Sequence, residues 1–476
     1  MSPRLVLPPL AVLLVLSTTQ GAAQGLSGRI AALRDGSATF TYAARPDVCG
    51  DGHNIILRSL QPHGEIIIFT DDGDMITSIG SARLGVCETG PVQLRFVVQD
   101  HRIGAIWPSV GRSAPRADVD LGVVNTAELV TWLLGVARTA SEETSSRALL
   151  AAALADSVRI STRVFAIVRD RSLAPTNREQ ALKWATRMAP REGNDTIAQG
   201  VRAIAADESE DPDVRERAIR VTIRPDDDAF LRQLYGRVTL TRLKERIIRE
   251  LGEEETPSTA NADWIMGVAR NERENVELRD RAIRVIGEDM HDVDRLRTLY
   301  PSLGNPDLKD RVVRSAAGEG STPSLQWIEA VAENANEPTD VRDRAIRGLG
   351  EQGQTAYLRR IYARLSVTDL QDRVLRELSE AGGTENLGFV RQVALDPNEH
   401  PDLRDRAVRA LDESGIRSEE LVRLYDTIAD RDLRDRLIRL MAERGDDVSR
   451  DKLAKIATSD PDADLRERAR RKLAER

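Results

Sequence analysis

Hydrophobic and polar residues follow two different periods along this chain. Between residues 24 and 113, apolar residues alternate with polar ones in five short runs, which is the pattern of strands with one buried face. Glycine, aspartate and proline stand between the runs and favour tight turns. The pattern predicts a small antiparallel β domain at 24–113, folded as a sandwich or a barrel. Its predicted strands cover residues 38–42, 54–60, 65–70, 91–98 and 102–107.

From about Asp118 onward the period becomes helical. In one example, Leu403, Ala407, Val408 and Leu411 fall on a single face of a helix. A second amphipathic segment precedes each helix of this kind, and the pair of helices recurs every 29 to 35 residues. The remainder of the chain, residues 114–476, is therefore predicted to be a mostly α, α-α superhelical solenoid of about ten helical hairpins.

A short phrase marks the second helix of each hairpin, as in Asp340-Val-Arg-Asp-Arg-Ala-Ile-Arg347. The fifth residue of the phrase, an arginine, marks its position and is called the anchor. Every second anchor is separated by 64, 65, 63, 62, 62, 63 and 62 residues in turn. The repeating unit is therefore a block of two hairpins. The Asp that opens the phrase is expected to cap the helix, and the acid three residues later to complete a capping box, as in Asp402 with Asp405.

This phrase resembles a known repeat. Residues Asp340 to Gly350 read Asp-x-Arg-x-x-Ala-x-x-x-Leu-Gly, which is similar to the second helix of short HEAT repeats, the type also found in phycobilisome-lyase-like proteins. The resemblance covers roughly residues 118–476 and is strong from Asp213 onward, with a departure at Thr241, where the capping Asp is missing. It implies a HEAT-like solenoid. It does not imply one function, because such repeats serve scaffolds, adaptors, lyases and DNA glycosylases.

The N-terminal segment 1–23 has the features of a secretory signal peptide. Arg4 is followed by an apolar run from Leu5 to Leu16 and then by small residues up to Ala23, after which cleavage is expected. A membrane anchor is the alternative, but a span takes roughly 20 apolar residues. The sequence therefore predicts an exported protein, periplasmic or extracellular, with no membrane span in the mature chain.

The only two cysteines, Cys49 and Cys87, both fall in the predicted β domain. In an exported protein they are expected to form a disulfide, which would support a thin core. The alternative is metal binding together with His53, His63 and His101, but no metal-ligand spacing supports it.

Composition narrows the class of function. Aromatic residues make up 4% of the chain and charged residues 31%, which suits stacked helices with aliphatic seams better than a compact globule. The sequence contains no Gly-x-Ser-x-Gly, His-Glu-x-x-His, phosphate-loop or dinucleotide motif, so it predicts a non-enzymatic protein without a cofactor. A net charge of −8 argues against nucleic acid as a partner.

Arginine is the one chemical feature that recurs in every phrase from residue 213 onward. The anchor arginine and a second arginine three residues later share a helix face, so they predict two parallel rows of guanidinium groups along a groove. Such rows suit carboxylates or phosphates. The candidate residues are Arg217, Arg220, Arg246, Arg249, Arg281, Arg284, Arg311, Arg314, Arg344, Arg347, Arg373, Arg376, Arg406, Arg409, Arg436 and Arg439.

The same arginines have a structural interpretation. The acid before each anchor, such as Asp343, lies four residues before the second arginine, so an ion pair is available within each helix. The anchor can also bond the capping region of the neighbouring repeat. The sequence leaves both interpretations open, a partner-binding surface and a structural ladder.

The function predicted from these observations is an exported scaffold or protein-protein interaction module with a protein or peptide partner. The first alternative is a module that binds an anionic peptide or polymer in an arginine-lined concave groove. The second alternative is a lyase-like enzyme, as some relatives of this repeat type are. The sequence specifies no oligomeric state.

Overall fold

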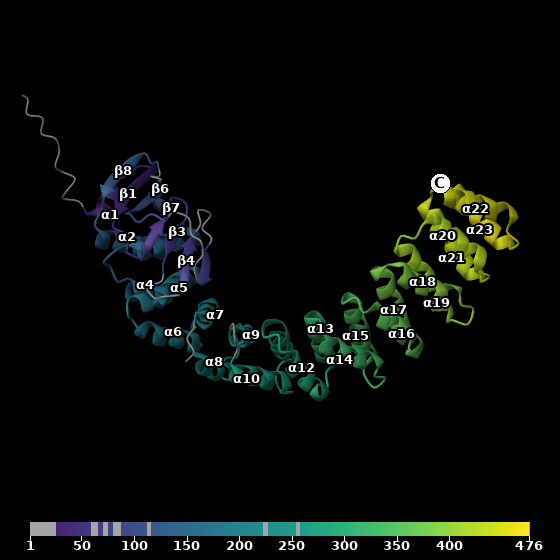
Figure 1. The fold of residues 1–476 in the computed structure, drawn as a ribbon. Helices are drawn as coiled ribbons and strands as arrows, with labels where there is room; N and C mark the ends of the chain where they lie inside the picture. The colour runs from purple at the N-terminus through teal and green to yellow at the C-terminus, as the bar shows by residue number, and fades with distance from the viewer. Residues whose placement is uncertain are drawn as a thin grey trace, which may run out of the picture. The chain divides into compact units, whose positions relative to one another are not determined.

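The computed structural model describes residues 25–58, 65–69, 75–79, 87–111, 116–221, 227–253 and 258–475. The predicted signal peptide at 1–23 and the predicted metal candidate His63 lie outside these ranges. The chain divides into two compact units, Met1–Ile247 and Ile248–Arg476, and each is considered by itself. Figure 1 shows strands and helices in the first unit and helices alone in the second.

The first unit begins with α1 (Leu26–Ala31) and two four-stranded sheets. Neighbouring strands are antiparallel except β1 and β8, which run parallel. The first sheet has the order β7-β6-β1-β8, with bounds Arg102–Val110, Val92–Gln99, Gly36–Tyr42 and Val119–Val123. The second sheet has the order β2-β3-β4-β5, with bounds Val48–Gly50, Ile55–Leu57, Glu65–Phe69 and Met75–Ile79.

The sheet region is antiparallel, as predicted, with one added parallel pair. Strand β8 lies beyond residue 113 and runs parallel to β1. Its sequence, Val-Asp-Leu-Gly-Val, contains an acid and a glycine, and both residue types are depleted in strands. Strands β2 and β5 were also not predicted, whereas β1, β3, β4, β6 and β7 overlap the five predicted runs.

The first sheet shares its core with the first two helices of the solenoid, α2 (Thr126–Thr139) and α3 (Glu142–Leu154). The ring of Trp132 in α2 lies 5.8 Å from that of Phe40 and 5.3 Å from that of Phe96. The hydroxyl of Tyr42 donates a hydrogen bond to the carbonyl of Ala151 in α3 at 2.7 Å. A sheet with one apolar face needs a covering layer, and these helices provide it.

The expected disulfide between Cys49 and Cys87 is present, with an S–S distance of 1.98 Å. It ties β2 to the segment that leads into β6. Because its residues are 38 positions apart, the bond restricts a long loop of the unfolded chain.

Helices form the rest of both units. In the first unit these are α4 (Ser161–Arg169), α5 (Pro175–Arg191), α6 (Thr196–Ala206), α7 (Pro212–Arg220), α8 (Asp227–Tyr235) and α9 (Thr241–Glu250), which extends past the division. The second unit contains α10 (Thr259–Arg270), α11 (Val276–Arg284), α12 (Val293–Leu299), α13 (Pro306–Glu319), α14 (Thr322–Glu333), α15 (Thr339–Glu351), α16 (Thr355–Ile361), α17 (Thr368–Ala381), α18 (Thr384–Leu395), α19 (Pro401–Glu413), α20 (Ser418–Thr427), α21 (Arg431–Arg444), α22 (Asp447–Ser459) and α23 (Ala463–Ala474).

Successive helices pair as hairpins, and the second helices of neighbouring hairpins stack on one another. In the second unit, α11, α13, α15, α17, α19, α21 and α23 each pack against the next in this series. The predicted apolar face is confirmed in α19, where Leu403, Ala407, Val408 and Leu411 are all buried. The chain is thus a helical solenoid preceded by a small sheet region. Within the described ranges, no helix has both the length and the apolar character that a membrane crossing requires.

The cap of the second helix lies two residues before the phrase, which corrects the sequence analysis. In α7, the Asp211 carboxylate accepts hydrogen bonds from the N–H groups of Asp213 at 2.9 Å and Val214 at 3.4 Å. Asp213, the expected cap, instead lies in the first turn, where the helix dipole stabilises a negative charge. Pro212 fits the first helical position because it has no N–H to satisfy. Equivalent caps are Asn275, Asn305, His400, Asp430 and Asp462.

One hairpin departs from regular α-helical geometry. A π-helix, Val285–Asp289, follows α11 and adds a wider turn between the anchors Arg281 and Arg311, which are 30 residues apart. His291 then adopts φ +54°, a left-handed conformation for which the corresponding turn after α15 uses Gly353, with φ +69°. The block length is therefore held nearly constant by packing and adjusted in the turns.

Candidate interaction surface

Within each unit, acids and arginines of the second helices form a repeating series of ion pairs, which we call the arginine ladder. In one rung, Asp310 of α13 lies 2.8 Å from the Nε of the anchor Arg344 of α15. The same carboxylate lies 3.2 Å from Arg314, four residues further along α13. Each rung therefore joins one second helix to the next. The anchor bonds the acid before the preceding anchor, rather than the capping region considered in the sequence analysis.

The other rungs repeat this geometry. In the second unit they are Asp280 with Arg311 (2.6 Å) and Arg284 (2.7 Å), Asp343 with Arg373 (2.6 Å) and Arg347 (3.6 Å), Asp372 with Arg406 (3.5 Å) and Arg376 (2.9 Å), Asp405 with Arg436 (2.8 Å) and Arg409 (3.1 Å), and Asp435 with Arg468 (2.7 Å) and Arg439. Asp405 thus takes part in a rung instead of the expected capping box with Asp402.

The remaining candidate arginines are anchors and second arginines of the helices near the boundary between the two units. In the first unit, Glu216 of α7 faces Arg246 at 3.3 Å and Arg220 at 3.6 Å. Arg217 lies 3.5 Å from Glu179 of α5. In the second unit, Arg249 pairs with Glu253 at 3.7 Å, and Arg281 is the anchor of α11.

The two arginine rows differ in exposure. The anchor side chains lie in the seams between helices, as Arg344 does with 17% of its side chain exposed. The second row is more open, and Arg347 and Arg376 are 34% and 39% exposed. The second row therefore presents guanidinium groups to solvent while an acid of the same helix fixes each one from one side.

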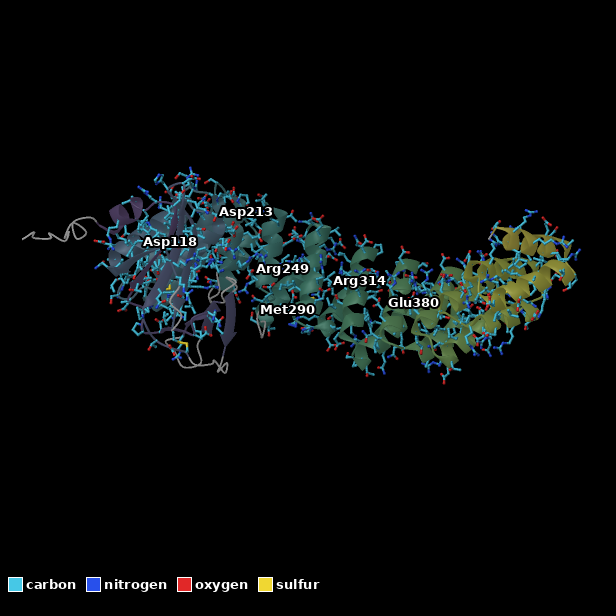
Figure 2. The ribbon with its side chains drawn as sticks, turned by 90° about the horizontal axis from the view of Figure 1, so that it is seen from above. Asp118, Asp213, Arg249, Met290, Arg314 and Glu380 are labelled. Carbon is cyan, nitrogen blue, oxygen red and sulfur yellow. A yellow bond between two sulfur atoms is a disulfide. The ribbon has the colours of Figure 1, made fainter. Side chains whose placement is uncertain are left out.

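A further row of acids borders the second arginines. It lies four residues after them, as Glu351 does after Arg347 and Glu380 after Arg376, and both glutamates are exposed. Figure 2 labels Glu380 in α17 and Arg314 in α13. Acid, arginine, arginine and acid follow one another across α15 and α17, whereas Gly318 takes the last position in α13. The surface therefore carries mixed charge and not the continuous positive charge that the arginine pattern alone indicates.

Glu377, four residues after the anchor Arg373, is a buried acid beside these rows. It lies in the seam between α17 and α15, with 7% of its side chain exposed, and its nearest cation is Arg373 at 3.7 Å. A Cβ placed on Gly350 would approach its Oε2 to 2.3 Å, so only glycine leaves room for it. Burial, together with the negative charges of Glu380 and Glu351, raises the pKa of Glu377 to about 7 against the attraction of Arg373 and Arg347.

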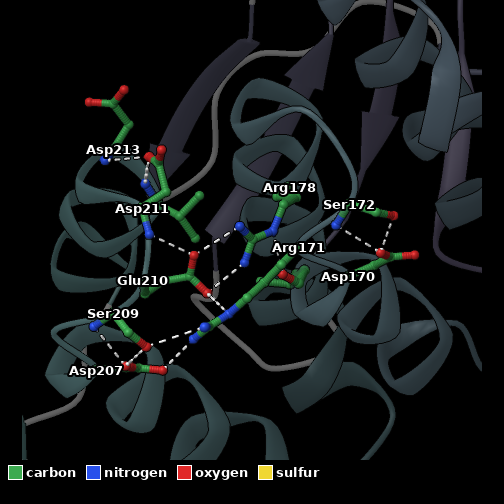
Figure 3. Close-up of polar contacts among 11 residues, drawn as sticks. Asp170, Arg171, Ser172, Arg178, Asp207, Ser209, Glu210, Asp211 and Asp213 are labelled. Atoms are coloured by element: carbon green, nitrogen blue, oxygen red, sulfur yellow. Dashed lines mark hydrogen bonds and ion pairs between the residues drawn. The ribbon is translucent and has the colours of Figure 1, made fainter.

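A second kind of arginine contact, which the sequence analysis missed, lies inside the hairpin turns (Figure 3). Arg178 of α5 donates two hydrogen bonds to the Glu210 carboxylate, at 2.8 and 2.6 Å, and a third from Nε to the carbonyl of Val168 at 2.7 Å. The Arg178 and Glu210 side chains are only 3% and 5% exposed. Burial acts to raise the pKa of Glu210, but hydrogen bonds from Arg178 and from the Asp211 N–H outweigh it, so that pKa lies below its ordinary value.

The turn contact recurs at the third residue of the phrase. The Nε groups of four buried arginines donate to the carbonyl ten residues earlier: Arg215 (3.2 Å), Arg279 (2.9 Å), Arg342 (3.0 Å) and Arg404 (3.3 Å). In α13 the third residue is Lys309, which pairs with Glu337 of the next turn at 2.8 Å. The sequence did contain a signal for this turn contact. One glutamate recurs at the spacing of the two-hairpin block, at Glu210, Glu274, Glu337 and Glu399.

The described part of the chain was also searched for side chains that could bind a metal ion. There, no three His, Cys, Asp or Glu side chains come together in a way that could hold a metal ion. Cys49 and Cys87 are joined to each other. Candidate chemistry therefore rests on the charged rows of the second helices.

Comparison with known proteins yields structural neighbours only. No protein-family model matches this chain, and no curated protein matches it. Similar solved structures, which include helical solenoids of the HEAT and armadillo type, are human deoxyhypusine hydroxylase in complex with glycerol (13% identity, 60% of this chain and 98% of that one, TM-score 0.23), the C-terminal fragment of the Chaetomium thermophilum cohesin loader SCC2 (14%, 74% and 35%, 0.26) and importin beta (10%, 74% and 47%, 0.28). The chain spans less than half of the last two.

Proposed function

We propose that this protein is an exported, non-enzymatic scaffold that binds a protein partner along the second helices of its solenoid. The observation that carries the proposal is the second arginine row of the second unit. Its guanidinium groups are partly exposed, regularly spaced and each held by an acid four residues away. A side chain that is already held in place loses less conformational entropy when it binds a partner.

The mixed charge of this surface favours a protein partner over a polyanion. Acids border the second arginine row on both sides, as Asp343 and Glu351 border Arg347. A polyanion lying along the row would meet these carboxylates and be repelled. A folded protein can present its own acids to the arginines and its own cations to the glutamates.

Two observations support export. The N-terminal segment 1–23 has the composition of a signal peptide. Cys49 and Cys87 form a disulfide, and such bonds persist mainly in oxidising compartments. We therefore place the partner in the periplasm or outside the cell.

The test compares two triple variants with the parent in a pull-down from envelope extract. The first removes part of the second row, as Arg347→Gln, Arg376→Gln and Arg409→Gln. The control removes the same charge from first helices of the same unit, as Arg360→Gln, Arg391→Gln and Arg423→Gln. Thermal unfolding followed by circular dichroism checks that all three proteins are folded.

We expect the parent and the control to retain a partner that the second-row variant loses, with binding that weakens as salt is raised. Retention of the partner by the second-row variant would remove this surface from the proposal. Loss of the partner from the control alone would place recognition on the first helices.

A further inference from the structure

A pocket lies between the first helices of two neighbouring hairpins in the first unit. Its volume is about 350 Å³, at the lower end of the range for ligand pockets. One face of α4, at positions i, i+3, i+4 and i+7, lines one side, and the first turn of α6 lines the other. These lining residues are Thr162, Phe165, Ala166 and Arg169 from α4, and Thr196 and Ile197 from α6.

Arg169 is held in this pocket by packing and not by an acid. Its guanidinium carbon lies 4.8 Å from the centre of the Phe165 ring. A Cβ placed on Gly200 of α6 would come within 2.5 Å of that ring and 3.4 Å of the Arg169 Nη2, so glycine leaves room for both side chains. Among the described residues, Arg169 forms neither an ion pair nor a hydrogen bond, whereas Arg202 of α6 bonds Asp227 at 2.6 Å.

Asp170 is the acid that lines this pocket, and its charge is already engaged. It directly follows α4 and pairs with Arg138 of α2. It also accepts hydrogen bonds from the Ser172 hydroxyl at 2.6 Å and from the Ser172 N–H at 3.1 Å, and these bonds lower the pKa of Asp170. Arg138 therefore balances the charge of Asp170, and within the described ranges no acid pairs with Arg169.

Two threonine hydroxyls of the pocket are oriented by one amide. Asn194, in the turn before α6, donates from Nδ2 to the Thr162 hydroxyl at 3.0 Å and accepts at Oδ1 from the Thr196 hydroxyl at 2.7 Å. The Thr162 oxygen accepts in this contact, so its own proton can donate to a ligand, whereas the lone pairs of the Thr196 oxygen can accept. The pocket thus combines a hydroxyl donor, a hydroxyl acceptor and the guanidinium of Arg169.

We propose that this pocket binds the carboxyl-terminal residue of a polypeptide whose last side chain is aliphatic. In such a residue a carboxylate and an apolar group diverge from one carbon. The carboxylate suits the guanidinium and hydroxyl donors, and the apolar group suits the surface of Phe165 and Ile197. The Thr196 oxygen can accept the N–H of the same residue.

An acidic side chain fits this pocket less well. A glutamate carries its carboxylate on an unbranched stem, so it has no apolar branch to place against Phe165 and Ile197. The proposed site is independent of the surface proposed in the second unit, and either can fail without the other.

The experiment is a calorimetric titration of the full chain at pH 7 with three acetylated pentapeptides. The first, acetyl-Gly-Ser-Gly-Ala-Leu, has a free carboxyl end, the second is its terminal amide, and the third is acetyl-Gly-Ser-Gly-Ala-Glu amide, with its carboxylate on the side chain. Each is titrated into the parent, Arg169→Gln, Ala166→Leu and Arg159→Gln. The last variant is the control, because it removes the same charge from an exposed position just before α4.

We expect the free-carboxyl peptide to bind the parent and Arg159→Gln, with affinity reduced about tenfold in Arg169→Gln because a charge-assisted hydrogen bond is lost. The amide peptide should bind the parent about tenfold more weakly than the free-carboxyl peptide, for the same reason. Ala166→Leu keeps every charge and fills the pocket from an exposed position, so it should fold like the parent and lose binding.

Three results overturn the site: no binding of the free-carboxyl peptide, equal binding by the parent and Arg169→Gln, or equal binding of the free-carboxyl and amide peptides. Preference for the glutamate peptide would assign the pocket to an acidic side chain and overturn the terminal carboxylate. Circular dichroism checks the fold of each variant. If Arg169→Gln does not fold, Ala166→Leu decides, and its binding like the parent overturns the site.

Discussion

Two regions of the molecule use the same pairing of arginine with an acid in different surroundings. In the first unit, Arg178 of α5 and Glu210 of the turn before α7 are almost completely buried and share two hydrogen bonds. In the second unit, Asp343 and Arg347 lie at the helix surface, 28% and 34% exposed, with 3.6 Å between them. The surface pair recurs along the second helices, and the turn pair has an equivalent in Lys309 with Glu337, so periodicity alone does not distinguish them.

The difference teaches that burial decides what an ion pair does for the fold. Removing one member of a buried pair leaves a charge without water or a partner, whereas solvent replaces the lost member of an exposed pair. The turn pairs therefore hold the hairpins together, and the second arginine row can change with little structural effect. That row is for this reason the part of the ladder most suited to recognition.

The largest effect is expected from Glu210→Ala. It leaves the Arg178 guanidinium buried without its carboxylate, and we expect a loss of about 3–5 kcal/mol in the free energy of unfolding of the first unit. Urea unfolding measures the loss, and hydrogen exchange in α5 and α7 locates it. Arg171→Ala is the control, because Arg171 also faces Glu210, at 3.5 Å, but is 51% exposed. Equal losses in the two variants would contradict the comparison.

A comparable loss, from apolar packing instead of charge, is expected from Leu403→Ala. Leu403 is 1% exposed in the seam of α19, so its truncation should cost about 2–5 kcal/mol. Disruption should centre on its own and the adjacent hairpins, as hydrogen exchange can show. A change below about 0.5 kcal/mol would mean that the exposed ladder, and not the apolar seam, holds the second unit together.

The buried Glu377 should make the stability of the second unit depend on pH. Its pKa of about 7 lies above that of an unfolded glutamate, so the folded state favours the protonated form. Its contribution to the stability of the second unit is therefore lost as pH rises from about 4.3 to about 7, and the difference in pKa corresponds to about 3–4 kcal/mol. Glu377→Gln should be more stable than the parent at pH 8 and similar at pH 4. Parallel pH profiles would show that Glu377 is not desolvated.

Glu210 should give the opposite sign. Its pKa lies below the ordinary value, so its contribution is present above about pH 4.3 and is lost as pH falls through the pKa of the folded state. Unfolding of the first unit between pH 5 and pH 2 measures this. A Glu210→Gln variant whose stability falls as steeply as that of the parent would assign the acid sensitivity to other carboxylates.

The smallest effect is expected from Arg347→Gln. Its pair with Asp343 is long and exposed, so the free energy of unfolding should change by less than about 0.5 kcal/mol. Thermal unfolding measures the change. A loss above about 1 kcal/mol would show that the second row is structural, which would weaken the case for a binding surface.

The repeat and its buried faces could be predicted because they depend on local spacing. Leu403 and Leu411 share a helix face in any helix, and an ion pair over four residues needs only one helix. The anchor contact could not be placed, because the acceptor of Arg344 is set by how α15 sits on α13. The capping residue was misplaced by two positions because both the cap and the first-turn Asp are polar residues near one helix start, as with Asp211 and Asp213.

Contacts between distant segments were the least predictable part of the fold and of the candidate site. Strand β8 has five residues and pairs with a strand far earlier in the chain, as Val119 does with Ala38, which no local pattern reveals. Trp132 reads as a solenoid residue in sequence, yet it packs on the sheet. Arg178 and Glu210 belong to different hairpins, and only the regular spacing of the turn glutamates indicated their role.

The ladder also bears on how such a chain can change its length. Every rung joins an acid of one hairpin to an arginine of the next, and the separations between anchors alternate between short and long. The segment 345–406 forms one complete period. If this segment were duplicated or lost in evolution, each acid would again face an anchor arginine in the next hairpin. The array can therefore grow or shrink by whole periods. Loss of a single hairpin would instead interrupt the alternation of short and long separations.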